Sequence, residues 1–250
     1  MPGSAAMEEN PEPLENEGII KRYTSEPGPQ PISSGDADLI GAITEHIERH
    51  LGPVEQVFHE IVSPTVHVDI HWVAPSRERP WHILVTSGMS ERPMNAPEGM
   101  EGFRYAELLV SLPATWPLTV EAFEDEANYW PLRWLKILAR FAHEYDTWLS
   151  FGHTMPNGNP PEPFAPSTQL CGMMLVPPAQ APDFFELDAG GGRTIHFWSL
   201  LPLHGDEVDL KLREGADALL DRFDKAGVGE VINPARPSVV PRGRWWRPGR

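Results

Sequence analysis

Three strand patterns follow one another between residues 66 and 113, and they constrain the fold more than any other feature of the sequence. In VHVDIHWV, at 66–73, apolar and polar residues alternate with the period of two of a half-buried strand. The run WHILVTSGMS, at 81–90, has three consecutive apolar residues, typical of a strand buried on both faces. RYAELLVSLP supplies a third strand, which ends at Pro113 because proline has no N–H for a ladder. Together they predict a sheet.

Amphipathic helices flank these strands. Asp36 is a candidate N-cap for a helix that ends at Gly52-Pro53, and Asn128 is a candidate N-cap for a second helix that runs to Tyr145. Both have an apolar stripe at helical spacing. A last helix is expected over 208–223, with Gly227 placed to stop it.

The remaining segments predict further strands and one long loop. A strand is expected at 54–62, and the Pro- and Gly-rich residues 152–166 predict a surface loop. TQLCGMMLV, at 168–176, reads as a strand. FFEL and TIHFWSLLPL read as a hairpin joined by the turn AGGGR, in which glycine can take positive φ without strain.

The order of these motifs resembles the suppressor-of-fused domain, which is found in animal signalling regulators and in many bacterial proteins. The most specific part of the resemblance is LVTSGMS followed by ELLVSLP, and a weaker similarity extends from Ile40 to NPARPS at 233–238. We expect an α/β (α+β) fold: a single domain over 36–232 with a mixed, mainly antiparallel sheet and packed helices. Residues 1–35 are expected to be a disordered leader and 233–250 a flexible basic tail.

Charge limits the classes of partner. The formal net charge is -16, and residues 236–250 hold five Arg and no acid, so the rest of the chain carries -16 - 5 = -21. Such a field repels nucleic-acid phosphates and speeds encounter with a basic protein, although solubility alone is the alternative explanation. The sequence has one cysteine, no secretory signal pattern and no apolar run of about 18 residues, which predicts a cytoplasmic protein without a membrane span.

The motif H-x-D-x-H, formed by His67, Asp69 and His71, is the strongest candidate for chemistry. Neighbours on one strand face lie nearly 7 Å apart, from a rise of about 3.3 Å per residue, so the three do not converge easily on one ion. We therefore expect no metal, no cofactor and a polar outer face here, and Cys171 in an apolar strand is expected to be inert. A small-molecule or metal-dependent enzyme that uses this face is the alternative function.

The resemblance implies protein binding. Animal members of the family sequester a transcription factor by accepting a short peptide strand, and bacterial members resemble immunity proteins for secreted polymorphic toxins. The expected function is thus a non-enzymatic binding module, an immunity protein that neutralises a toxin or a related regulatory protein. The animal regulators have a second domain that helps to clasp the peptide, and nothing in this sequence corresponds to it.

Two groups of residues are candidates for partner binding. The polar positions that match the family pattern would meet an added strand, and they are Asp69, Thr86, Ser87, Ser90 and Glu107. The acidic residues Glu121, Asp125 and Glu126 would attract a basic partner. The alternatives are that 86–90 is simply a tight turn with Gly88 at positive φ, and that the acidic residues serve a helix N-terminus.

Overall fold

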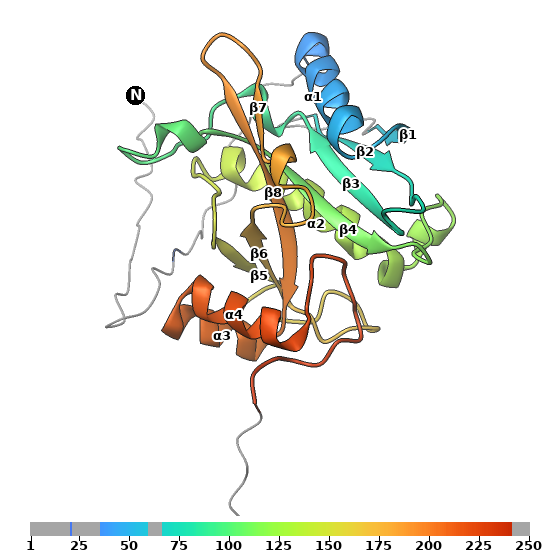
Figure 1. The fold of residues 1–250 in the computed structure, drawn as a ribbon. Helices are drawn as coiled ribbons and strands as arrows, with labels where there is room; N and C mark the ends of the chain where they lie inside the picture. Colours follow the sequence, from blue (N-terminus) through green and yellow to red (C-terminus); the bar gives the residue numbers. More distant parts are fainter. Residues whose placement is uncertain (1–20, 22–35, 60–66, 242–250) are drawn as a thin grey trace, which may run out of the picture.

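The computed structural model describes residue 21, residues 36–59 and residues 67–241. The predicted leader, apart from Lys21, and the residues after 241 lie outside the described residues. Within that part of the chain, eight strands form one sheet in the order β1-β2-β3-β4-β8-β6-β5, with β7 also paired to β8 (Figure 1). The strands are β1 Val54–Phe58, β2 Asp69–Val73, β3 Trp81–Ser87, β4 Tyr105–Pro113, β5 Thr154–Pro156, β6 Gly172–Val176, β7 Glu186–Asp188 and β8 Thr194–Leu203.

The pairing is mixed and mainly antiparallel, as the sequence predicted. Strands β4 and β8 are parallel, with Glu107 opposite Phe197, and every other strand pair of the described sheet is antiparallel. The helices are α1 Ala37–His50, α2 Glu126–Glu144, α3 Gly205–Glu214 and α4 Ala216–Ala226, and the short 3-10 helices are η1 Met89–Glu91, η2 Glu101–Phe103, η3 Ala122–Glu124 and η4 Pro182–Phe184.

Helices cover both faces of the sheet (Figure 1). Trp198 of β8 belongs to the core cluster under α2, whereas its neighbour Phe197 belongs to the cluster under α1. Leu201 and Leu203, farther along the same strand, pack under α3 and α4. Because successive side chains of a strand point to opposite faces, β8 contributes to all three clusters and ties the layers together.

Local signals explain where the helices begin and end. The side chain of Asp36 accepts a hydrogen bond from the Leu39 N–H at 3.2 Å, so the predicted cap of α1 is confirmed. The prediction of Asn128 as the cap of α2 was wrong: Asp125 caps it, accepting from the Ala127 N–H at 2.9 Å. The expected last helix is interrupted at Gly215, whose φ of 91° divides it into α3 and α4.

The predicted loop at 152–166 contains the short strand β5, which pairs with β6. The glycines at 190–192 all have positive φ and join β7 to β8, as expected of the hairpin turn. Gly227, with φ of 68°, ends α4 as predicted.

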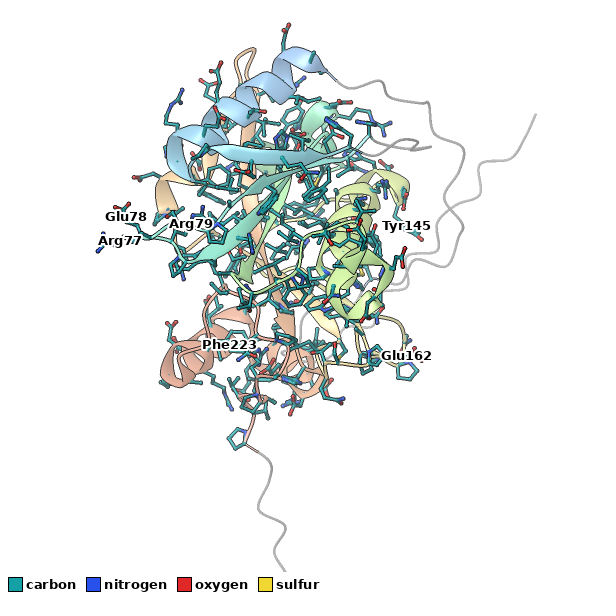
Figure 2. The ribbon with its side chains drawn as sticks, turned by 90° about the vertical axis from the view of Figure 1, so that its right-hand side faces the viewer. Arg77, Glu78, Arg79, Tyr145, Glu162 and Phe223 are labelled. Atoms are coloured by element: carbon teal, nitrogen blue, oxygen red, sulfur yellow. The ribbon has the colours of Figure 1, made fainter. Side chains whose placement is uncertain are left out.

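Residues 233–241 pack on the domain, so the predicted start of the flexible tail at residue 233 is too early in the sequence. Arg236 is only 8% exposed and forms a two-pronged ion pair with the fully buried Glu207, at 2.5 and 2.6 Å. Its guanidinium also lies 5.0 Å from the ring centroid of Phe223, at the α3–α4 end of the molecule (Figure 2). The same carboxylate accepts from the Val239 N–H at 2.9 Å. These contacts fasten the segment to α3.

We predict that Arg236→Ala lowers the free energy of unfolding by about 3–5 kcal/mol, because it leaves the Glu207 carboxylate buried without its counter-ion. Arg213→Ala, at an exposed position of α3, is the matched control and should change stability by less than about 0.5 kcal/mol. Urea unfolding followed by circular dichroism measures both. Equal effects of the two substitutions would show that the ion pair does not hold this segment.

Candidate functional site

A buried carboxylate organises the end of β3 and β4. Glu107 of β4 is 0% exposed and accepts hydrogen bonds from the turn that follows β3. Its Oε2 accepts from Thr86 Oγ1 at 2.7 Å, and its Oε1 accepts from Ser90 Oγ at 2.6 Å and from the N–H groups of Gly88 and Ser90 at 3.0 and 2.9 Å. One carboxylate thus fixes the whole turn.

Gly88 presses this turn against the start of β2. Its φ is 109°, and a Cβ added there would lie 1.9 Å from the carbonyl oxygen of His67. Only glycine fits, because the conformation and the close approach of the two backbones both exclude a side chain. The segment 86–90 is therefore the tight turn with Gly88 at positive φ that the sequence analysis gave as the alternative.

The structure places most of the predicted partner-binding side chains in the interior. Thr86, Ser90 and Glu107 are 0% exposed and Ser87 is 1% exposed. Ser87 Oγ lies 2.9 Å from His71 Nε2 in a buried hydrogen bond. These four side chains are buried and hydrogen-bond within the molecule. They are therefore not exposed for the direct contact with a partner that the sequence suggested.

The predicted polar outer face of β2 was also wrong. Asp69 and His71 are 4% and 1% exposed. Val73 on the same face of β2 packs with Val85 and with Ile43 of α1, so helix α1 covers this side of the sheet. Burial lowers the pKa of His71, while the nearby Asp69 carboxylate acts in the opposite direction.

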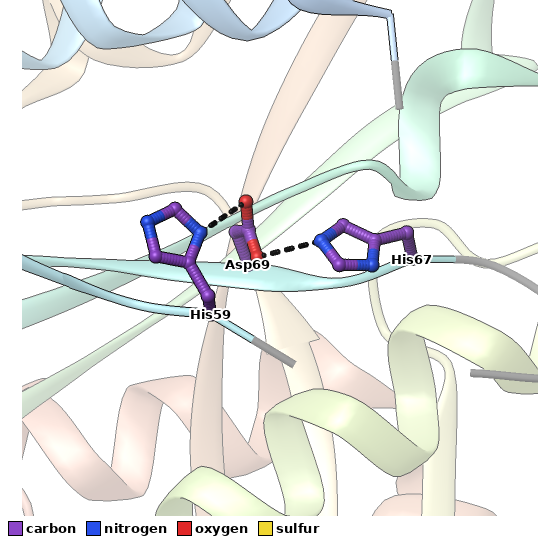
Figure 3. A group of neighbouring side chains, drawn as sticks. All are labelled: His59, His67 and Asp69. Atoms are coloured by element: carbon purple, nitrogen blue, oxygen red, sulfur yellow. Dashed lines mark hydrogen bonds and ion pairs between the residues drawn. The ribbon is translucent and has the colours of Figure 1, made fainter. Parts of the chain in front are cut away.

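Asp69 lies between two histidines (Figure 3). His59 Nδ1 is 3.0 Å from Asp69 Oδ2, and His67 Nε2 is 3.0 Å from Asp69 Oδ1. His71 belongs to the Ser87 contact instead, so the predicted motif H-x-D-x-H does not converge. His59, which is not part of that motif, takes the place of His71 beside Asp69. The antiparallel register of β1 and β2 pairs Phe58 with Ile70, which sets the next residue, His59, opposite Asp69, and that register is the signal that could have found it.

The acidic residues after β4 have separate roles. Asp125 caps α2, and Glu126 forms an ion pair with Arg133 at 2.6 Å, so both serve the helix as the alternative reading proposed. Glu121 is exposed. Phe123 lies within the acidic segment 121–126, and its ring centroid is 5.6 Å from that of Phe58 in β1. The acidic segment is therefore beside the outermost strand of the sheet.

The described residues form two pockets of a size that a small ligand could occupy. One, of about 260 Å³, is open to solvent and lies beside His153 and Lys211. The other, of about 380 Å³, lies between α1 and the β7–β8 turn and includes Asp36 and Arg193. Neither brings an acid, a base and a nucleophile together. Burial raises the pKa of the Cys171 thiol, which fits its predicted inertness.

One family model covers more than half of the chain. The family model "Suppressor of fused protein (SUFU)" matches residues 64–237. No curated protein matches the sequence significantly. No helix among the described residues is long and apolar enough to cross a membrane.

Solved structures with this fold include a SUFU homolog from Neisseria gonorrhoeae, with a TM-score of 0.60 and 18% identity over 83% of this chain and 100% of that chain. A chain from the Sufu-Fu complex gives a TM-score of 0.57 and 16% identity over 86% and 93% of the two chains. Drosophila Suppressor of Fused gives 0.58 and 16% over 81% of this chain and 51% of its own length. This chain thus spans about half of the Drosophila protein.

We predict that Glu107→Ala costs about 3–5 kcal/mol, because it leaves the buried donors of Gly88 and Ser90 without an acceptor. Glu107→Gln should cost less than about 1.5 kcal/mol. The glutamine Oε1 can keep the three hydrogen bonds of the turn, and the glutamine Nε2 can donate to Thr86 Oγ1. The Thr86 hydroxyl can then donate to the Leu108 carbonyl oxygen, which lies 3.3 Å away. Chemical denaturation of the two variants measures these costs.

The pH dependence of the same pair tests the charge of Glu107. Burial raises the pKa of this carboxyl, against the opposing effect of its hydrogen bonds from Ser90, Thr86 and Gly88. A raised folded-state pKa adds stability that is present below the unfolded pKa and is lost as pH rises through the folded pKa. The wild type should therefore lose stability relative to Glu107→Gln as pH rises above the ordinary pKa of a glutamate. A wild type that gains stability relative to Glu107→Gln as pH rises would contradict this.

Proposed function

Because the chain belongs to the suppressor-of-fused family, we propose that it is a non-enzymatic protein-binding module that acts in the cytoplasm and captures a basic protein partner. The family includes a protein solved as the Sufu-Fu complex, which supports protein binding as the mode of action. The observation that carries the proposal for this chain is the acidic segment beside the edge of β1 that no other strand of the described sheet pairs with.

The edge of β1 is the better of the two ends of the sheet for accepting a strand. In the described sheet β1 pairs on one side only, with β2, and β5 is at the other end. Strand β5 has three residues, and Pro156, its last, has no N–H to offer. Strand β1 has five residues and no proline, so it presents more main-chain groups to an incoming peptide.

The residues around this edge suit a basic partner. Glu55 and Gln56 of β1 are exposed, and so are Glu121 and Glu124, which flank the Phe123 that contacts Phe58 of β1. Val120, next to Glu121, is 73% exposed, which gives the acidic surroundings one apolar contact point. We call the edge of β1 together with residues 120–124 the β1 surface. It combines hydrogen-bonding main chain, an apolar side chain and negative charge.

The partner that we propose is a basic toxin domain, which the protein binds and neutralises as an immunity protein. The charge of -16 + (-5) = -21 outside residues 236–250 favours fast capture of a positive protein, which an immunity protein needs in order to protect its own cell. The resemblance to bacterial suppressor-of-fused proteins supports the same class.

In this proposal the buried residues of the turn support the surface without touching the partner. Gly88 contacts the start of β2, and β2 holds β1 in register. Glu107 and its hydrogen-bond donors Thr86 and Ser90 keep that turn in place. Asp69 lies opposite the end of β1, at the border of the β1 surface. The family-matched positions thus act by positioning the outer strands.

We predict that association with the partner, such as a toxin encoded next to this gene, is electrostatically steered. Raising ionic strength from about 0.05 to 0.5 M should slow association much more than it speeds dissociation, because the screening length falls below about 8 Å. Stopped-flow or surface-based binding kinetics measure both rates. An association rate that is indifferent to salt would refute the electrostatic part of the proposal.

Charge reversal locates the steering surface. The triple variant Glu55→Lys, Glu121→Lys and Glu124→Lys should slow association by about 10-fold or more, and it leaves the cap Asp125 and the paired Glu126 intact. The matched control reverses Asp217, Asp221 and Asp224 on α4, which are exposed and lie at the other end of the molecule (Figure 1). Equal slowing by both variants would assign the effect to net charge and not to the β1 surface.

We predict that the partner protects β1 from hydrogen exchange. Outward-facing amides of Val54–Phe58 should exchange quickly in the free protein and slowly in the complex, because an added strand accepts their hydrogen bonds. Strand β5 should show no change. Mass spectrometry of peptides covering each strand measures this. Protection at β5 with none at β1 would place the partner at the wrong edge for this proposal.

A further inference from the structure

We propose that His59, His67 and Asp69 form a binding site for a divalent transition-metal ion, with Zn²⁺ the best fit. The site lies at the end of β1 and the start of β2 (Figure 3). It is independent of the proposed partner binding, and neither the family match nor the proposed function requires it.

The geometry brings three ligand atoms together from two strands. The two histidine nitrogens and a carboxylate oxygen lie within 4.8 Å of one another. Each histidine is already 3.0 Å from one oxygen of Asp69. Ligands of a tetrahedral zinc ion, at bond lengths of about 2.0–2.1 Å, are about 3.3–3.5 Å apart. The two 3.0 Å contacts reach different oxygens of Asp69, so the three ligand atoms, which lie within 4.8 Å of one another, must move together by up to about 1.5 Å to reach this spacing.

The remaining adjustment falls on the side chain that is free to make it. The side chain of His59 is 69% exposed, that of His67 is 26% exposed, and that of Asp69 is 6% exposed. The fixed carboxylate therefore provides the anchor, and the exposed imidazole of His59 can turn to bring its Nδ1 closer to His67 Nε2. An ion can enter from the solvent side past His59.

The donor set matches the chemistry of zinc. Two imidazole nitrogens and one carboxylate oxygen make up a set that zinc uses in proteins, with a water molecule completing the coordination. Two neutral histidines and one aspartate carry a single negative charge, so a divalent cation neutralises the buried carboxylate. The sequence analysis expected no metal because His67, Asp69 and His71 do not converge, whereas the set in the structure contains His59, the residue after β1, in place of His71.

The polar groups around Asp69 are incompletely paired without an ion. Among the described residues no hydrogen-bond donor is aligned with Asp69 Oδ1, although His67 Nε2 is close enough for an ion pair. His71 Nδ1, two residues along the strand, is likewise buried without a described partner. A simple ion pair with protonated histidines is the competing explanation. The exposed His59 gives such a pair little energy, because water screens it.

A bound ion would join two points that are separated in sequence. His59 follows β1 and His67 precedes β2, so coordination would join the end of one strand to the start of the next. An ion that binds the folded chain and not the unfolded one stabilises the folded state by its binding free energy. The proposed site therefore has a structural effect, the fastening of the outermost hairpin.

The test is zinc binding by tag-free full-length protein. Isothermal titration with ZnCl₂ after dialysis against chelator should show one site per chain, and saturating zinc should raise the Tm. His59→Ala should weaken binding by at least about 100-fold, since even residues that only support metal ligands contribute about 10–100-fold. His59 is exposed, so this variant should keep the circular dichroism spectrum and the chelator-treated Tm of the wild type.

The controls separate this site from the other histidines. His50→Ala, at an exposed position of α1 next to His46, should bind zinc as the wild type does. His67→Ala and Asp69→Asn should lose binding as His59→Ala does. The absence of zinc binding in the wild type would overturn the proposal, and so would binding that survives His59→Ala combined with His67→Ala. Because no partner takes part, failure here leaves the protein-binding proposal untouched.

Discussion

The hydrogen bonds between the Glu107 carboxylate and the turn at 86–90 are the interaction on which the rest of the structure depends. A carboxylate without partners in the interior would cost several kcal/mol, so its position in β4 requires the donors of Thr86, Gly88 and Ser90. This turn also requires glycine at position 88, because the backbone of His67 occupies the space that a side chain at position 88 would need. Strands β2, β3 and β4 are thus fixed to one another at one end.

This fixed end determines where the outer elements lie. Strand β1 pairs with β2 in a register that ends with Phe58 opposite Ile70, and His59, the next residue, contacts Asp69. The contact between Phe58 and Phe123 then places the acidic segment after β4 against the same outer strand. Strand β1 and residues 120–124 therefore lie side by side, although they are separated by more than fifty positions in the sequence.

The opposite end of the sheet is held by another buried charge. Arg236 and Glu207 neutralise each other under α3, and the ion pair makes residues 233–241 part of the domain. Both ends therefore use a buried carboxylate with a full set of donors. At the β1 end the donors are neutral groups of a turn, whereas at the α3 end the main donor is a guanidinium whose planar geometry matches the carboxylate.

The sequence by itself determined the elements that depend on local chemistry. The alternation at 66–73, the apolar run at 83–85 and the stop at Pro113 predicted three strands, and Asp36, the glycines at 190–192 and Gly227 predicted a cap, a turn and a helix end. The resemblance carried by LVTSGMS and ELLVSLP gave the family and the mixed sheet. These features are readable because hydrophobic period and backbone conformation act over a few residues.

Tertiary structure alone decided which polar side chains are buried and which of them meet. Asp69 and His71 alternate with apolar residues, which predicts a solvated face, but α1 covers that face from a distant part of the sequence. Glu107 binds the turn at 86–90 because β3 and β4 pair. His59 lies next to Asp69 because of the β1–β2 register. The sequence placed Arg236 in a flexible basic tail, whereas in the structure it is buried against Glu207, its counter-ion. Each outcome depends on contacts between separate segments, which no local pattern contains.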